Sequence, residues 1–235
     1  MILTSKVFIR GVAACAVICA AATFSQAATI IKLNLGGVGP DIGMNGAGIL
    51  STTNDGVVAT VGDQNTDIEF TGGLNFVPDL NTNTASFTLQ GLTEVGPANV
   101  FGSLVIQNFL GGQFSLYDPS NVLLLQGPLT NSALTGVLGP PGTGALFTTT
   151  LGAVTGGTLA PFIVPGTVSL SMNMTTVNGG SGFVVAGGGP QLNPFLADAS
   201  LSIAAETVPE PATMTLLATG LVGMMGAARR RKRTA

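Results

Sequence analysis

An unbroken alternation of apolar and polar side chains runs through eight residues, Val168-Ser169-Leu170-Ser171-Met172-Asn173-Met174-Thr175. Successive side chains of a β-strand point to opposite faces, so a period of two predicts a strand with one face buried and one face in water. We therefore expect a half-buried strand over residues 168–175. This segment indicates a β fold, and the rest of the chain can be compared with that expectation.

Similar but shorter patterns occur on both sides of this segment. Further strands are expected at 67–70, 86–89, 114–117 and 201–203 by alternation, and at 57–61, 100–106, 122–125, 146–150 and 183–186 by apolar content. No amphipathic helix pattern is found between residues 28 and 207. About ten short strands with frequent turns predict an all-β fold, either a β-sandwich or a jelly-roll-like domain.

Turn residues separate the expected strands. Residues 118–121, Asp-Pro-Ser-Asn, fit a type I turn with proline at its second position. The glycine pairs 111–112, 156–157 and 179–180 permit positive φ and are expected in turns. The glycine-rich stretch 36–48 lacks the spacing of a phosphate-binding loop, so we expect an irregular lead-in there.

The C-terminal residues 208–235 have three parts in a fixed order. First comes a short proline-bracketed acidic motif over 208–213, which contains Val208, Pro209, Glu210 and Pro211. An uncharged segment follows at 212–228, for which we expect a single transmembrane helix. At 1.5 Å per residue this helix would span roughly 25 Å, slightly less than a hydrocarbon core of about 30 Å. The chain ends in a basic tail, 229–235, with Arg229, Arg230, Arg231, Lys232 and Arg233.

This arrangement resembles the PEP-CTERM sorting signal, in which Pro-Glu-Pro precedes a transmembrane helix and a basic cluster. The resemblance covers residues 208–235 alone and implies nothing about the fold of the preceding domain. It implies recognition by an exosortase-type membrane protease, which removes the tail during export. It also implies a link to exopolysaccharide production and biofilm formation. The basic cluster would be retained on the cytoplasmic side of the inner membrane.

The N-terminus has the pattern of a secretory signal peptide over residues 1–27. Lys6 and Arg10 precede an apolar stretch at 11–24, and Ser25 and Ala27 supply the small residues before a cleavage site. We expect cleavage after Ala27, following passage through the export translocon. An exported domain of residues 28–207 would remain between the two signals, long enough to form one core.

The composition of residues 28–207 excludes several function classes. This segment has no Cys, His or Trp, and its only cation, Lys32, stands against ten carboxylates, which gives a net charge of −9. Nucleic acids are not expected as partners, because phosphate binding needs clustered Lys and Arg. Disulfides and thiolate metal sites are also excluded.

We expect no catalytic activity. Nucleophilic schemes need a base beside the nucleophile, usually His, and the chain has none. Two carboxylates can hydrolyse glycosides, but sugar clefts generally also use aromatic platforms, and Tyr117 is the only Tyr. A hydrolase is therefore the weakest of the functions considered.

One local cluster suggests calcium as the single cofactor to consider. Oxygen-bearing side chains occupy alternate positions at Asp63, Asn65, Asp67 and Glu69. This spacing is similar to the first half of a calcium loop. Ile68 stands where such a loop has glycine, so a turn that leads into a strand is the favoured interpretation.

The sequence therefore predicts an exported, non-catalytic protein of the cell envelope or extracellular matrix. It would be anchored briefly in the inner membrane with a cytoplasmic C-terminus, trimmed by an exosortase-type protease, and released to the cell surface or beyond. The alternative is a lectin-like module that binds carbohydrate or cations.

Overall fold

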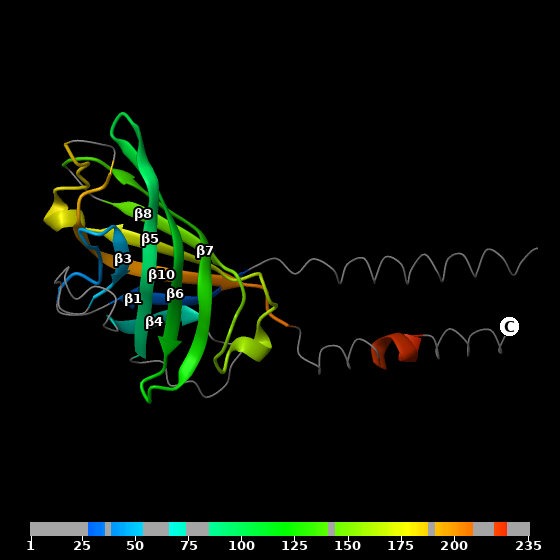
Figure 1. Cartoon of the computed structure of the whole chain (residues 1–235). Helices are drawn as coiled ribbons and strands as arrows, with labels where there is room; N and C mark the ends of the chain where they lie inside the picture. The colour runs from blue at the N-terminus through cyan, green and yellow to red at the C-terminus, as the bar shows by residue number, and fades with distance from the viewer. Residues whose placement is uncertain are drawn as a thin grey trace, which may run out of the picture.

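The computed structural model describes residues 28–35, 39–53, 66–73, 85–140, 144–187, 191–208 and 219–224. In these residues, antiparallel strands dominate (Figure 1). They are β1 (Ala28–Leu35), β2 (Ile42–Met44), β3 (Ile49–Thr52), β4 (Thr66–Gly73), β5 (Ala85–Phe101), β6 (Leu104–Tyr117), β7 (Leu123–Val137), β8 (Ala145–Leu151), β9 (Ser169–Thr175) and β10 (Phe195–Ala205). Two 3₁₀ turns accompany them, η2 (Ala160–Phe162) and η3 (Val177–Gly180).

The strands form one sheet that closes on itself. Their order is β1-β4-β5-β3-β2-β10-β9-β8-β7-β6, and β6 pairs back to β5 while β1 pairs back to β10. Two pairs of short strands, stacked along the barrel axis, connect β5 to β10. β3 and β2 complete the ring at one level along the axis, and β4 and β1 complete it at the other. Each level is thus a barrel of eight strands. The all-β prediction is confirmed.

The prediction of a sandwich or jelly roll is wrong, because those folds split the strands between two sheets with free edges. Here β5, β6 and β7 are 17, 14 and 15 residues long, enough to bend around the core. The bending occurs at irregularities, such as the register shift between Val95 and Asn99. Bulges of this kind increase the local twist that closure of a barrel requires.

The barrel interior is filled by alternate side chains, most regularly in β8, β9 and β10. In β9, Leu170, Met172 and Met174 are almost fully buried, so the strand predicted at 168–175 is confirmed in place and in orientation. β8 and β10 alternate in the same way along their whole length. Aromatic pairs meet in this core, including Phe87 of β5 with Phe114 of the neighbouring β6, whose ring centroids are 6.1 Å apart.

The edge of β10 changes its partner halfway along its length. Phe195 to Ala197 pair with β2, and pairing with β1 begins at Ser200. At the exchange, the amide of Ala199 donates to Oδ2 of Asp41 at 3.0 Å. Asp41 is only 3% exposed, and its backbone also bonds Ala197 and Thr53. A side-chain carboxylate thus replaces the missing strand neighbour.

β5, which flanks the short strands on their other side, exchanges partners in the same way. Ala85 to Phe87 pair with β4, and Leu92 and Thr93 pair with β3. Between them, the Thr52 hydroxyl accepts from the Leu89 amide at 3.0 Å and donates to the Leu89 carbonyl at 3.2 Å. At both exchanges, a buried side chain therefore forms hydrogen bonds with backbone groups that have no strand partner. Buried backbone amides and carbonyls need such partners.

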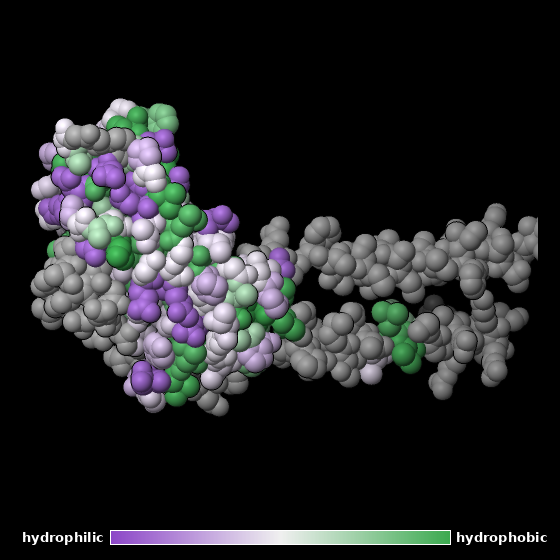
Figure 2. Space-filling view, in the orientation of Figure 1, coloured by the Kyte–Doolittle hydropathy of each residue, from purple (hydrophilic) through white to green (hydrophobic). Residues whose placement is uncertain are grey.

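Two expectations for turns and strands are wrong around β5 and β6. The run 100–106 is not one strand, because the chain reverses at Gly102 and Ser103 between β5 and β6. Its apolar side chains pair across the hairpin instead, Phe101 with Leu104, and they form the apolar tip at the top of Figure 2. The glycine pair 111–112 lies inside β6, where both residues have positive φ but make no turn, and β6 keeps its register with β5 across them.

The remaining local expectations had mixed outcomes. The turn at 118–121 is confirmed, with the Asn121 amide bonded to the Asp118 carbonyl at 2.9 Å. The lead-in expected at 36–48 is wrong for residues 42–44, which form β2 with all three residues buried. Residues 183–186 make isolated bridges and no strand, and residues 57–61 lie outside the described residues.

We predict that Asp41→Ala lowers the free energy of unfolding by about 3 kcal/mol, because the buried Ala199 amide loses its charged acceptor. Urea denaturation followed by circular dichroism measures this change. Asp118→Ala is the matched control, since that carboxylate accepts two backbone amides on an exposed turn. Equal losses in the two variants would contradict the proposed importance of the exchange on β10.

Candidate functional site

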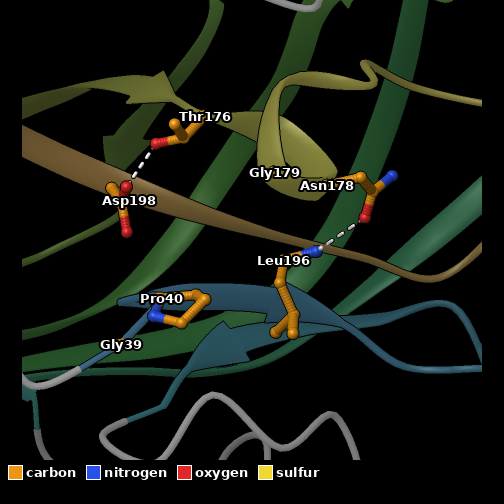
Figure 3. A pocket seen from close by; sticks show the side chains of 7 residues that line it. All are labelled: Gly39, Pro40, Thr176, Asn178, Gly179, Leu196 and Asp198. Carbon is orange, nitrogen blue, oxygen red and sulfur yellow. Dashed lines mark hydrogen bonds between the residues drawn. The ribbon is translucent and has the colours of Figure 1, made fainter.

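A hollow of about 500 Å³ lies on the outside of the barrel, where β9 ends and β10 begins (Figure 3). This volume is within the range of small-molecule sites. Three separate segments supply its lining, which consists of Gly39, Pro40, Thr176, Asn178, Gly179, Leu196 and Asp198. The lining combines short polar side chains with two apolar ones.

A tight, left-handed turn after β9 forms one wall of the hollow. Thr176, Asn178, Gly179 and Gly180 all have positive φ, between 49° and 90°. Asparagine and glycine tolerate this conformation, whereas a β-branched threonine rarely adopts it. The turn is fastened to β10 because Oδ1 of Asn178 accepts from the Leu196 amide at 3.3 Å. Its Nδ2 donates to the carbonyl of Gly182 at 2.9 Å.

Asp198 is the only charged side chain that lines the hollow. The Thr176 hydroxyl donates to its Oδ2, and Figure 3 shows the other carboxylate oxygen pointing away from Thr176. No hydrogen bond in the described part of the chain occupies that second oxygen. The carboxylate of this half-exposed aspartate, beside apolar Pro40 and Leu196, suits a ligand that offers hydroxyl donors and C–H surface.

Glu94 is a second carboxylate in an unusual environment, and no sequence pattern pointed to it. Its amide donates to the carbonyl of Gly48 at 2.9 Å, and its side chain lies over that glycine, where a Cβ would come within 2.6 Å of Cγ. Oε2 is buried with no hydrogen-bond partner among the described residues. Burial raises the pKa of Glu94 above its ordinary value. It lies at the β3–β5 contact and does not line the hollow.

Most of the sites predicted from the sequence lie outside the described residues. This applies to Ser25 and Ala27, to the basic cluster at 229–233, and to Pro209, Glu210 and Pro211. Val208 is described, and its amide donates to the carbonyl of Phe162 at 2.9 Å. The first residue of the motif is thus bonded to the barrel, and the Pro-Glu-Pro residues follow it directly.

The calcium set is only partly described. Asp63 and Asn65 lie outside the described residues, while Asp67 and Glu69 belong to β4, with Asp67 opposite Ser86 and Glu69 opposite Asn34. A strand at this position agrees with the favoured interpretation. Calcium binding stays a prediction.

The predicted transmembrane segment is described only over a short helix at 219–224. Among the described residues, no helix has the length and apolar character needed to cross a membrane.

The described residues thus form an all-β barrel with a polar hollow and a C-terminal tail that starts at its surface. Residues 207–232 match the family model for the PEP-CTERM protein-sorting motif. The chain therefore carries a PEP-CTERM motif at its C-terminal end, as predicted from the sequence. This motif implies an exported protein that is targeted to an exosortase through a C-terminal membrane-anchored sorting signal. No curated protein and no solved structure shows a significant match to the chain.

We predict that Asn178→Ala destabilises the protein by about 2 kcal/mol, because it removes two hydrogen bonds and places alanine at positive φ. Asn178→Gly is the matched variant, since it loses the same bonds without the backbone strain. Its loss, measured by urea denaturation, should be smaller. The opposite order would show that the backbone conformation at Asn178 costs nothing.

We also predict that Glu94→Gln stabilises the protein at pH 7. The raised pKa means that the folded state binds a proton more readily than the unfolded state, so wild-type stability falls as pH rises from the ordinary glutamate value through the raised one. The variant lacks this loss, and its advantage in melting temperature should shrink toward pH 4. Glu206→Gln controls for the removal of one negative charge. An advantage that does not change with pH would contradict the prediction.

Proposed function

We propose that this protein is an exported, non-catalytic component of the cell envelope or extracellular matrix. In this proposal, an exosortase-type protease trims the tail while the chain is held in the inner membrane, and the barrel is then released to the surface. The observation that carries the proposal is the PEP-CTERM match at 207–232, which begins two residues after β10 ends at Ala205.

The arrangement of the barrel ends supports this processing. β1 begins at Ala28, immediately after the predicted signal cleavage, and Ala28 pairs with Ala205 at the end of β10. Both predicted signals therefore leave from one edge of the barrel. Glu206, Thr207 and Val208 are bonded to Val164, Ile163 and Phe162, so the last residues before the Pro-Glu-Pro sequence belong to the folded body. Removal of both signals leaves every strand intact.

The chemistry available supports the proposal of a matrix role over an enzymatic one. The chain has no His, the Asp41 carboxylate pairs the Ala199 amide of β10, and the Glu94 side chain lies against Gly48. A stable acidic barrel with one lysine is suited to remain soluble among polymers outside the cell. The link to exopolysaccharide is part of this proposal.

Fractionation of the native host, followed by intact-mass analysis, tests the proposal. We expect an extracellular or surface form that lacks the signal peptide and the residues from 212 onward in the wild-type host. A strain without the processing protease should retain the full tail. Replacement of Pro209, Glu210 and Pro211 by alanine should block trimming, while Glu206→Gln, just outside the motif, should leave it unchanged. A full-length tail in both strains would overturn the proposed route.

A further inference from the structure

The hollow beside Asp198 continues into a polar strip along the outside of the barrel. β10 alternates strictly, with Phe195, Ala197, Ala199, Leu201, Ile203 and Ala205 buried. Leu196 and Asp198, which line the hollow, therefore share the outer face with Ser200 and Ser202. β10 thus contributes residues both to the hollow and to the polar strip that continues from it.

The strands on both sides of β10 supply matching polar side chains. In β9, Thr175, Asn173 and Ser171 lie opposite Asp198, Ser200 and Ser202. In β1, Asn34 and Lys32 lie opposite Ser200 and Ser202. We call these eight residues the hydroxyl strip, and they are Asp198, Ser200, Ser202, Thr175, Asn173, Ser171, Asn34 and Lys32.

The outer neighbours extend the same chemistry. Thr148 of β8 lies opposite Ser171 and is exposed. Strands lie about 4.8 Å apart and alternate residues about 6.7 Å apart, so the strip is a regular grid of polar groups. Its Ser, Thr and Asn side chains both donate and accept hydrogen bonds. Its two charges lie at opposite ends, Asp198 in the hollow and Lys32 beside Ser202.

Several classes of ligand fit this surface poorly. A peptide strand has no free edge of β10 to join, because β9 pairs with one edge, and β2, the Asp41 carboxylate and β1 occupy the other. A metal ion is not favoured, since no group of three or more His, Cys, Asp or Glu suited to a metal occurs among the described residues. Nucleic acid is disfavoured by the single lysine. A ligand with many hydroxyl groups uses donors and acceptors equally, and this is what the grid provides.

We propose that the hollow and the hydroxyl strip form one binding surface for a polysaccharide. One sugar unit lies in the hollow, where its hydroxyl groups donate to the free oxygen of Asp198 and its C–H face packs on Pro40 and Leu196. The following units lie along β10 and bond Ser200, Ser202 and the neighbouring Asn173. This inference rests on the proposed function, because an exported protein is the one that meets such a polymer.

Affinity electrophoresis and calorimetry of the full chain, purified in mild detergent, test the inference. The probes are dextran, a soluble β-glucan and the polysaccharide recovered from the host's own culture. We expect at least one probe to be bound by wild-type protein, and Asp198→Ala to weaken binding about tenfold, the loss of one hydrogen bond to a charged group. The double variant Asn173→Ala and Ser200→Ala should weaken binding on the strip without disturbing the core. Asp118→Ala, which changes a distant exposed aspartate, is the control.

Absence of binding to every probe would overturn the inference, and so would wild-type affinity in both the Asp198 variant and the strip variant. If Asp198→Ala fails to fold, the strip variant alone decides the outcome. The result is separable from the proposed function. If the protein is trimmed in the host but binds no polysaccharide, only the binding inference is wrong. If it is not trimmed but binds with the predicted variant pattern, only the processing route is wrong.

Discussion

Closure of the barrel depends on two strands that each exchange partners along one edge. β10 passes from β2 to β1, and β5 passes from β4 to β3. Each exchange would leave buried backbone groups unpaired, at a cost of about 1–3 kcal/mol per group. Asp41 pairs the Ala199 amide, and Thr52 pairs both the amide and the carbonyl of Leu89. Domains are stable by only about 5–15 kcal/mol, so these two side chains account for a substantial part of the free energy that keeps the ring closed.

The same exchange explains where the hollow lies. Because β2 pairs with the first residues of β10, the segment that precedes β2 brings Gly39 and Pro40 beside Leu196 and Asp198. The left-handed turn after β9 closes the other side through Asn178. Beyond the exchange, β1 takes over as the neighbour and carries Asn34 and Lys32 onto the outer face. The hollow and the strip are thus consequences of how the ring is completed.

Local sequence patterns predicted some elements well and others badly. The alternation at 168–175 gave β9 and its buried face, because that pattern depends only on the period of a strand. The apolar run at 100–106 was misleading, since apolar side chains continue through the turn at Gly102 and pair across a hairpin. Gly111 and Gly112 were expected in a turn, yet both residues adopt positive φ inside a long strand that keeps its register with β5. A sandwich and a barrel have the same alternation, so periodicity did not distinguish them.

By itself, the sequence determined the all-β class, the acidic and cation-poor character of the domain, and the sorting motif of the tail, because each is written in local order or composition. The tertiary structure alone decided that the sheet closes and that Asp41 is buried. It also brought residues 39–40, 176–179 and 196–198 to one hollow. These features depend on contacts between distant residues: Asp41 and Ala199 are 158 positions apart. No local pattern records such a pairing, since it is selected by how all the strands together bury one core.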